Sequence, residues 1–570
     1  MKLLLATSFL LLISFFVKAQ SINRYDVVIS EIMADPSPVI GLPNNEWIEL
    51  KNISASPINL QGWRIADASG QSGAMATYIL QPGSMVIICA NSAATSLSVY
   101  GDVLPVTSFP SLDNDGELIF LKTENNQVMH AIEYNITWYK NELKKEGGWS
   151  LEMINPQTPC AGISNWTASI DNNGGTPGLI NSVHSLTTDL SLPVLKRSYS
   201  TSNSTVILVF DEGIDSASAV PISNYQADNG LTITNAIALE PLFNEIQLHF
   251  NQPMEPGKIY SITATNIRSC NGQALPAQNT VRTGIKEDIS VRDLVVNEIL
   301  FNPRSNGNDF VEYYNRSEKI IDAADLYIAN RNSSGDISSA RPISDVPFLI
   351  FPGDYFVTTT DRENLQLNYL VKDPGAVFEL PSLPSFPDDE GIVLLLNKQG
   401  DVIDEVNYHR NWHFKLIDND EGISLERIDP DATSQLSANW QSAASTVGYG
   451  TPTYVNSQLK QNGISDMAIS ISPKIFSPDN DGQDDFVMIN YAFDEPGYVA
   501  NITLFDAAGR PVKNLVRNGT LAQQGSWKWD GLNENNQALP VGNYIIFTEI
   551  FNLQGSTKKF KNVVVLAKRF

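Results

Sequence analysis

The sequence predicts an all-β protein built as a string of four β-sandwich domains. Short alternating or wholly apolar runs rich in Val, Ile, Leu and Tyr, such as residues 85–90, 117–121 and 128–134, are separated by Pro-Gly, Asp-Gly and Asn-Asn turn signals. That pattern is typical of antiparallel sandwiches. No stretch keeps a 3.6-residue periodicity over about ten residues, so we expect few helices.

A long internal repeat organises the chain. Residues 28–36 (VISEIMADP) and 46–50 (EWIEL) return as residues 296–303 (VNEILFNP) and 309–313 (DFVEY). A repeat of this length indicates duplicated domains, because solenoid periods are only about 20 to 50 residues. Further landmarks recur in the same order: Gln81-Pro82-Gly83 with Phe351-Pro352-Gly353, Asp115-Gly116 with Glu390-Gly391, Ser150-Leu151-Glu152 with Ser424-Leu425-Glu426, Asn165-Trp166 with Asn439-Trp440, and Gly175-Thr176-Pro177 with Gly450-Thr451-Pro452.

The first residues have the pattern of a secretory signal peptide. An apolar run from Leu3 to Val17 ends in the small-residue motif Val17-Lys18-Ala19, which predicts a signal peptide over residues 1–19 and cleavage before Gln20. The run is shorter than the roughly 20 residues that a bilayer-spanning helix needs, which disfavours a membrane anchor. No cysteine follows the cleavage site, so a lipid anchor is also disfavoured, and no later segment predicts a transmembrane span.

The composition limits the classes of partner. The 570-residue chain is too long for a single core and carries a formal net charge of -25. That charge repels phosphate backbones and anionic lipids, so neither nucleic acid nor a membrane surface is an expected partner. The charge does not exclude cations or neutral polymers as partners.

The three cysteines suggest one disulfide. Cys89 and Cys160 lie in the first repeat, and the aligned positions of the second repeat hold Thr359 and Ser434. Because a bonded pair is expected to be absent as a pair, we predict a Cys89–Cys160 disulfide. Cys270 is then a leftover thiol, expected to be buried and inert.

Both repeats carry a family resemblance. The Ile-x-Glu-Ile opening, the Glu-Trp-Ile-Glu-Leu element and the Leu60–Trp63 turn, followed by the Ser-Leu-Glu, Asn-Trp and Gly-Thr-Pro landmarks, resemble the lamin tail domain, an immunoglobulin-like sandwich. In the second copy Leu326-Tyr327 replaces the Gly-Trp turn. The resemblance implies lamin tail domains at residues 20–183 and 288–456. It also implies interaction with a protein partner and a surface or matrix role.

Residues 184–287, between the two repeats, have their own strand pattern. Apolar runs at Thr205–Phe210 and Ile246–Phe250, with a further run at 256–262, predict strands of a separate sandwich. This pattern is similar to that of bacterial immunoglobulin-like modules of S-layer and other surface proteins. The resemblance implies a spacer domain, which completes a string of immunoglobulin-like sandwiches together with the last domain.

A polar linker at residues 457–465 precedes the last domain, residues 466–570. The Ser-Pro-x-x-Asp-Gly-x-x-Asp opening at 477–485, Trp529-Asp530-Gly531 and the Leu-Pro-x-Gly-x-Tyr motif at 539–544 resemble gliding-motility-associated C-terminal domains and the immunoglobulin-like domain of hook-capping proteins. The resemblance implies a sorting signal for type IX secretion and contact with that machinery. The usual Asn-Gly-Asp-Gly of the family is Asp-Asn-Asp-Gly here, which leaves the sorting class open.

The same opening contains a candidate calcium site. Oxygen-bearing side chains at alternate positions around Gly482 can face one hard cation, as in calcium loops. The candidate ligands are Asp479, Asp481, Gln483 and Asp485. The alternative is an Asx-rich turn without an ion. Asp113–Gly116 and Asp388–Gly391 are weaker candidates, because a hairpin turn explains both.

Two pairs of glutamates are candidates for catalysis, but a structural role explains them better. Glu31 with Glu49, and Glu298 with Glu312, have the composition of a glycosidase acid and base, but their recurrence in both copies of a binding fold favours a structural role.

His409 and His413 are spaced like helical metal ligands, but their segment predicts strand and loop, which favours a surface pair without metal. The repeated tryptophans (Trp138, Trp166, Trp412 and Trp440) are core residues or sugar-binding platforms, and core packing is the more common fate.

These patterns together predict a secreted, non-enzymatic protein of the cell surface, at the outer-membrane face. Its lamin-tail-like modules would bind an extracellular protein or polysaccharide, and its last domain would mediate export. No motif of nucleophilic, zinc or nucleotide chemistry is present in the sequence. The alternative is a polysaccharide-binding accessory protein or a cryptic extracellular hydrolase.

Overall fold

The computed structural model describes residues 22–186, 192–276, 279–415, 417, 419–460, 468–479, 482–552 and 555–568. The predicted signal peptide and most of the predicted linker, with Asp481 of the candidate calcium loop, lie outside these residues. Spatial contacts divide the chain into two compact units. The first holds the described residues up to Arg197 with Thr205–Gln252 and Ser261–Val281; the second holds Ser198–Ser204, Pro253–Tyr260 and the described residues from Arg282 onward. The four-domain division stays a prediction.

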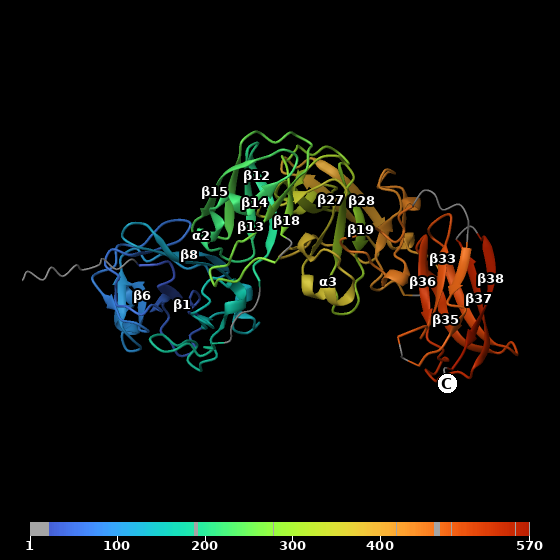
Figure 1. Cartoon of the computed structure of the whole chain (residues 1–570), viewed down its shortest axis with the longest axis horizontal. Helices are drawn as coiled ribbons and strands as arrows, with labels where there is room; N and C mark the ends of the chain where they lie inside the picture. Colours follow the sequence, from blue (N-terminus) through green and yellow to red (C-terminus); the bar gives the residue numbers. More distant parts are fainter. Residues whose placement is uncertain are drawn as a thin grey trace, which may run out of the picture. The chain divides into compact units, whose positions relative to one another are not determined.

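The first module, residues 22–186, is a β-sandwich (blue to teal in Figure 1). Its large sheet has the strand order β11-β10-β1-β2-β6-β7, and a second sheet has the order β4-β8-β9. Only the β6–β7 pairing of these two sheets is parallel. The strands are β1 Val27–Met33, β2 Trp47–Asn52, β3 Ile58–Asn59, β4 Arg64–Ala66, β5 Ile79–Leu80, β6 Met85–Ala90, β7 Val103–Val106, β8 Gly116–Lys122, β9 Val128–Asn135, β10 Leu151–Met153 and β11 Trp166–Ala168, with a short helix α1 at Ala94–Leu97.

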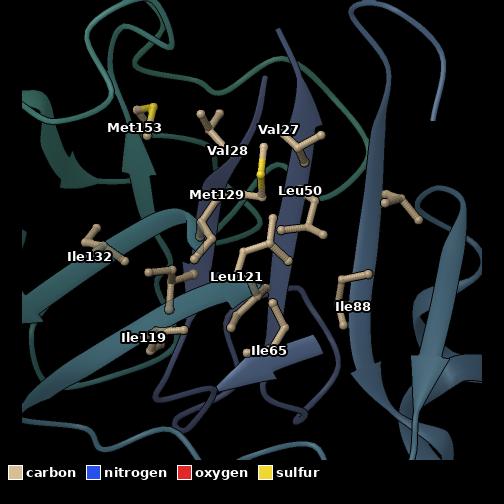
Figure 2. Close-up of a cluster of buried hydrophobic side chains, with 14 of the residues drawn as sticks. Val27, Val28, Leu50, Ile65, Ile88, Ile119, Leu121, Met129, Ile132 and Met153 are labelled. Carbon is tan, nitrogen blue, oxygen red and sulfur yellow. The ribbon is translucent and has the colours of Figure 1, made fainter. Parts of the chain in front are cut away.

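The core of the first module lies between its two sheets. Figure 2 shows Val27 and Leu50 of the large sheet facing Leu121 and Met129 of the smaller one. Every residue of β1 is buried, because the sandwich core covers one of its faces and a return segment of chain covers the other. This arrangement explains why apolar and polar residues do not alternate along β1, where Val27, Val28 and Ile29 are consecutive.

The second module, residues 284–460, has the same large sheet. Its order β30-β29-β19-β20-β25-β26 matches that of the first module strand for strand, and its other large sheet has the order β23-β22-β27-β28. A β-bulge interrupts the β1–β2 pairing between Ile29 and Glu31, and another interrupts β19–β20 between Val296 and Glu298. The strands are β19 Leu294–Leu300, β20 Phe310–Asn315, β21 Ile321–Asp322, β22 Leu326–Arg331, β23 Ile337–Pro342, β24 Leu349–Ile350, β25 Tyr355–Thr359, β26 Val377–Glu379, β27 Glu390–Asn397, β28 Val402–His409, β29 Leu425–Arg427 and β30 Trp440–Ser442, with helix α3 at Arg362–Asn368.

The middle segment, residues 192–283, and the C-terminal module, residues 468–568, are also built from β-sheets, and the β32–β38 pairing of the C-terminal module is parallel. In the middle segment β16 pairs with β13 and β15, while β14 pairs with β17. The C-terminal module stacks a sheet of order β31-β33-β36 on one of order β32-β38-β37-β34-β35 (red in Figure 1). The strands are β12 Leu195–Ser202, β13 Thr205–Phe210, β14 Tyr225–Ala227, β15 Ile233–Leu239, β16 Glu245–Phe250, β17 Tyr260–Ala264, β18 Thr280–Thr283, β31 Ala468–Ser472, β32 Ile475–Phe476, β33 Val487–Ala492, β34 Val499–Asp506, β35 Pro511–Thr520, β36 Gln524–Trp529, β37 Gly542–Phe551 and β38 Thr557–Leu566, with helix α2 at Ser216–Ala219. The all-β prediction is therefore confirmed.

The predicted Cys89–Cys160 disulfide is wrong. Cys160 is bonded to Cys270 with a Cα–Cα distance of 6.2 Å, and Cys89 is a buried free thiol. Cys89 lies on β6, whereas Cys160 follows β10, which is three strands away in the same sheet. Three strand spacings amount to about 14 Å, beyond the reach of a disulfide.

Candidate functional site

Three buried glutamates meet on one face of the large sheet of the first module. Glu31 of β1 lies in register with Glu49 of β2 and with Glu152 of β10. Cross-strand partners project from the same face of a sheet, so the three carboxylates converge. All three side chains are completely buried.

The carboxylates accept hydrogen bonds from the return segment, residues 174–183. Glu31 accepts from the Thr176 backbone N–H at 2.8 Å, and Glu49 accepts from the Gly178 backbone N–H at 2.6 Å. Glu152 accepts from the Val183 backbone N–H at 3.1 Å and from Ser182 Oγ at 2.8 Å. We call this arrangement the glutamate clasp, because it fastens the end of the module to its central strands.

The second module repeats the clasp with the return segment 449–458. Glu298 accepts from the Thr451 N–H at 2.9 Å, and Glu312 accepts from the Thr453 N–H at 2.5 Å. Glu426 accepts from the Gln458 N–H and from Ser457 Oγ, both at 2.7 Å. Buried asparagines reinforce both copies: Asn181 Nδ2 donates to the Ser30 and Met153 carbonyls, and Asn456 Nδ2 donates to the Asn297 and Arg427 carbonyls.

One threonine hydroxyl in each clasp lies between two carboxylates. Thr176 Oγ1 is 3.3 Å from Glu31 Oε2 and 3.0 Å from Glu152 Oε1. Thr451 Oγ1 is 3.0 Å from Glu298 Oε2 and 2.9 Å from Glu426 Oε1. A hydroxyl has one hydrogen and donates to one acceptor. The second contact is therefore a hydrogen bond only when one carboxyl of the pair is protonated.

Electrostatics favour the same protonation. In the first clasp, burial and the neighbouring glutamates raise the pKa of Glu31 well above its ordinary value, and burial raises the pKa of Glu49 to about 7. In the second clasp, burial and Glu426 raise the pKa of Glu298 to about 8, and burial and Glu298 raise the pKa of Glu312 well above its usual range. Burial also raises the pKa of Glu426. Each clasp is thus able to hold a proton at neutral pH.

Glycines permit the close approach of the return segments. A Cβ on Gly175 would lie 2.8 Å from Ser150 Oγ and 2.9 Å from Glu31 Oε1. A Cβ on Gly450 would lie 2.7 Å from the ring of Tyr369. The recurring Gly-Thr-Pro motif is therefore a packing requirement of the clasp.

The clasp geometry supports the structural interpretation of Glu31 with Glu49, and of Glu298 with Glu312. A glycosidase carboxylate must reach a sugar, but these side chains have no exposed surface. Sequence reasoning missed Glu152 and Glu426 together with Thr176 and Thr451. Their signal was present, because Ser-Leu-Glu and Gly-Thr-Pro recur in both repeats.

The candidate calcium loop is described only in part. Gly482 N–H donates to Asp485 Oδ2 at 2.9 Å, and Ser477 N–H donates to the Asp484 carbonyl at 2.9 Å, as in a carboxylate-rich turn. Asp479, Gln483 and Asp485 lie in the described residues and Asp481 does not. Within the described part of the chain, no group of three His, Cys, Asp or Glu side chains is placed to hold a metal. Calcium binding in the loop stays a prediction.

The two histidines with ligand spacing have different environments. His409 ends β28 and lies 3.0 Å from Glu390, whereas His413 is only 6% exposed and its Nδ1 lies 2.9 Å from Ser442 Oγ. The expectation of a surface pair is therefore wrong for His413. The chain between them forms a short 3-10 helix, η7 (Arg410–Trp412), instead of a regular α-helix.

The repeated tryptophans form two matched pairs. Trp166 and Trp440 are buried in their module cores, at 1% and 2% exposure. Trp138 packs on Trp166 with ring centroids 6.5 Å apart, and Trp412 stacks on Trp440 at 6.1 Å. Trp166 and Trp440 are thus core residues, whereas Trp138 and Trp412 keep part of their surface exposed.

One family model matches the sequence. It is the Lamin Tail Domain, and it covers residues 20–135, which include β1 and β2 with Glu31 and Glu49. No curated protein matches the chain. The described residues contain no helix of the length and apolar character needed to cross a bilayer.

Several solved structures match the chain at low sequence identity and low TM-score. They include the N-terminal part of the bacterial S-layer protein SbsC (11% identity, 38% of this chain and 44% of that chain, TM-score 0.16). A DUF4876 family protein from Bacteroides thetaiotaomicron matches at 14% identity over 36% of this chain and 84% of that chain, with a TM-score of 0.18. Dimeric latent PorU from Porphyromonas gingivalis matches at 9% identity over 71% of this chain and 35% of that chain, with a TM-score of 0.15. This chain therefore spans about half the length of the S-layer chain, and TM-scores this low say nothing about function.

Proposed function

We propose that this protein is a secreted structural or adhesive component of the cell surface, whose modules bind an extracellular protein or polysaccharide. The observation that carries the proposal is the Cys160–Cys270 disulfide, which ties the first module to the middle segment. Disulfides form and persist in oxidising compartments outside the cytosol. A covalent tie between neighbouring modules suits a chain that bears mechanical load.

Non-covalent contacts stiffen the same joint. The Arg24 guanidinium of the first module lies 3.6 Å from the ring centroid of Phe243 in the middle segment, and it donates to the Leu242 carbonyl at 3.2 Å. A guanidinium stacked on an aromatic ring gains cation–π attraction as well as apolar contact. The first module and the middle segment are thus linked by a covalent bond, a stacked cation and a hydrogen bond.

The joint between the second module and the C-terminal module is polar and specific. Ser445 Oγ donates to the Thr520 carbonyl, and Thr520 Oγ1 donates to the Ala443 carbonyl, each at 2.9 Å. Gln458 Nε2 donates to the Leu521 carbonyl at 3.1 Å, while Gln458 Oε1 accepts from the Gly497 N–H at 3.1 Å. Gln458 therefore links the clasp, through its own backbone N–H, to the next module.

The proposal includes a second lamin tail domain at residues 288–456 and an export role for the C-terminal module. The matching strand order, bulge position and clasp of the second module support the duplication. Calcium in the 479–485 loop is proposed to stiffen the C-terminal module near its linker.

Surface proteolysis of intact cells tests the proposal. We would compare the full-length chain with a chain that ends before Asp466. The full-length chain should be cleaved by external protease or released, and the truncated chain should stay protected inside the cell envelope. If both chains are exposed, the export role is wrong. If neither is exposed, the surface location is wrong as well.

The alternative is a cryptic hydrolase or polysaccharide-binding accessory protein. A screen against common polymers with the wild type and with a Glu31→Gln, Glu298→Gln double variant separates the two classes. Because both glutamates lack exposed surface, we expect no turnover that depends on them. An activity of the wild type that the double variant loses would contradict the structural assignment of the clasps.

A further inference from the structure

A cleft of about 680 Å³ opens in the second compact unit, where the second module meets the C-terminal module. The second module forms one wall through η7 and the residues around β30. The turn before β34 and the end of β37 form the other wall. The lining residues that matter below are Trp412, Lys415, Gln441, Lys460, Glu495 and Asn552.

The two walls are held in place by the hydrogen bonds that join these modules. Ser445 Oγ donates to the Thr520 carbonyl, and Gln458 accepts from the N–H of Gly497, which itself lines the cleft. The cleft is thus a built feature of one compact unit.

An anchored aromatic side chain forms part of the cleft wall. Trp412 is half-buried and stacks on Trp440 with an interplanar angle of 28°. Trp440 is fixed from beneath, because its Nε1–H donates to the Ser434 carbonyl at 2.9 Å and the Arg427 guanidinium lies 4.8 Å from its ring centroid. The first module has the corresponding Trp138–Trp166 pair. A rigid indole at the edge of a cleft offers apolar area with little entropy to lose, which suits contact with a sugar ring.

The charges of the cleft favour an acidic ligand. Lys415 and Lys460 are exposed, and neither forms an ion pair with another described residue. Glu495 is the only carboxylate among the described residues that line the cleft, and the amides of Gln441 and Asn552 add hydrogen-bonding groups. The chain as a whole is acidic, but charges more than about 8 Å away are largely screened at physiological ionic strength.

We propose that this cleft binds an acidic polysaccharide, with a uronate ring against Trp412 and its carboxylate near Lys415 and Lys460. The inference rests on the proposed surface function and assigns that function a site and a ligand class. An acidic peptide is the competing occupant that the experiment must separate.

The test measures binding of oligogalacturonate to the full-length protein by calorimetry. Neutral cello-oligosaccharides and polyglutamate serve as comparison probes. The Lys415→Ala, Lys460→Ala double variant should bind oligogalacturonate about tenfold more weakly, which corresponds to about 1.4 kcal/mol, because the variant loses two exposed ion pairs with the ligand. The matched control is Lys558→Ala, Lys561→Ala, which removes the same charge from exposed positions of β38 and should leave binding unchanged.

Two further variants separate binding from damage to the fold. Glu495→Gln should bind about twofold more tightly, which a merely destabilised variant would not do. Trp412→Leu should lose most of the affinity, whereas Trp138→Leu, which disturbs the matching pair of the first module, should retain it.

Several results would overturn the inference. The inference is wrong if the wild type does not bind oligogalacturonate, or if it binds neutral oligosaccharides equally well or polyglutamate more strongly. It is also wrong if both lysine double variants lose affinity for oligogalacturonate equally. The proposed surface function fails separately: a chain that is not exposed on intact cells contradicts that function, whatever it binds in solution. A chain that is exposed but does not bind oligogalacturonate contradicts only the cleft assignment.

Discussion

Thr451 Oγ1 contacts Glu298 and Glu426 at nearly equal distances, and its single hydrogen serves only one of them. This contact therefore stabilises the folded state most when one of the two glutamates is protonated. The pKa of Glu298 is raised to about 8, which agrees with this geometry. Glu312, Tyr369 and Tyr454 are further titratable groups near Glu298, and Glu298 helps to raise the pKa of each.

The first prediction concerns the pH dependence of this cluster. An unfolded glutamate loses its proton near pH 4.5, whereas Glu298 keeps its proton up to about pH 8. Between these values the native state binds more protons, so the free energy of unfolding falls as pH rises, by at most about 1.4 kcal/mol per pH unit for one group. Protection of peptides covering residues 449–458 in hydrogen exchange, corrected for intrinsic rates, should be higher at pH 5 than at pH 8.

Glu298→Gln should remove part of that dependence. A glutamine amide resembles the protonated carboxyl, accepts from the Thr451 N–H and offers its own N–H toward Thr451 Oγ1. We expect protection close to that of the wild type at pH 5 and equal or greater protection at pH 8. Peptides covering residues 174–183 provide the internal control and should not change. Equal loss of protection at both pH values would mean that the cluster requires a full set of ionised carboxylates.

The sequence predicted only part of this site. Glu31 and Glu49 were predictable because both lie in the sequence that recurs at the start of each module. Glu152 lies on the three-residue strand β10, which pairs with β1 across more than a hundred residues of chain. No local sequence pattern indicates which distant strand pairs with β1. The position of Glu152 beside Glu31, and of Thr176 between these two carboxylates, is therefore known only from the three-dimensional structure.

At the level of elements, strands with clear periodicity were predictable and the shortest ones were not. The run Thr205–Phe210 and the run Ile246–Phe250 fall on β13 and β16. Two-residue strands such as β3 and β5 have no periodicity to detect. The Asp-Gly motif predicted a hairpin turn at Gly116. Gly116 has a φ of +129°, but it opens β8, whose sheet does not contain the preceding strand β7, so this turn joins two sheets instead of closing a hairpin. At Gly391 the reason for glycine is different, because a Cβ would lie 2.4 Å from the Tyr408 hydroxyl.

The second prediction concerns the glycine of the return segment. Gly450→Ala places a methyl group 2.7 Å from the Tyr369 ring and 3.3 Å from Glu298 Oε1. Neighbours on both sides are buried, so we expect the free energy of unfolding to fall by about 1–3 kcal/mol. Chemical denaturation of the full chain measures this loss. Gly542→Ala is the matched control in the same compact unit, since its Cβ meets no atom within 4 Å, and an equal loss there would contradict the clasp explanation.

At the level of the whole molecule, the repeat was visible in the sequence but the joints were not. Comparing the two repeats pointed to Cys89 with Cys160, because both are missing from the second copy. That comparison could not include Cys270, which lies in the middle segment and has no repeated counterpart. The bond joins two modules, and the same holds for Arg24 with Phe243 and for Gln458 with Gly497. Contacts between modules depend on loop ends, where hydrophobic periodicity carries no information.

The third prediction follows from the disulfide. Peptide mapping without reduction should recover Cys160 linked to Cys270, and Cys89 should react with alkylating reagents only after unfolding, because burial raises its pKa to about 11.

The Cys160–Cys270 bond closes a separation of 110 residues, for which the chain-entropy model gives a stabilisation of about 4 to 5 kcal/mol. Cys160→Ser should therefore lower the unfolding temperature of the first compact unit and increase proteolysis between the first module and the middle segment. Cys89→Ser changes a cysteine that is buried within the first module and should leave that joint intact. A Cys89–Cys160 peptide would mean that the Cys160–Cys270 bond does not form. Equal nicking in the two variants would mean that the bond does not stiffen the joint. Either result would remove the main support for a load-bearing function.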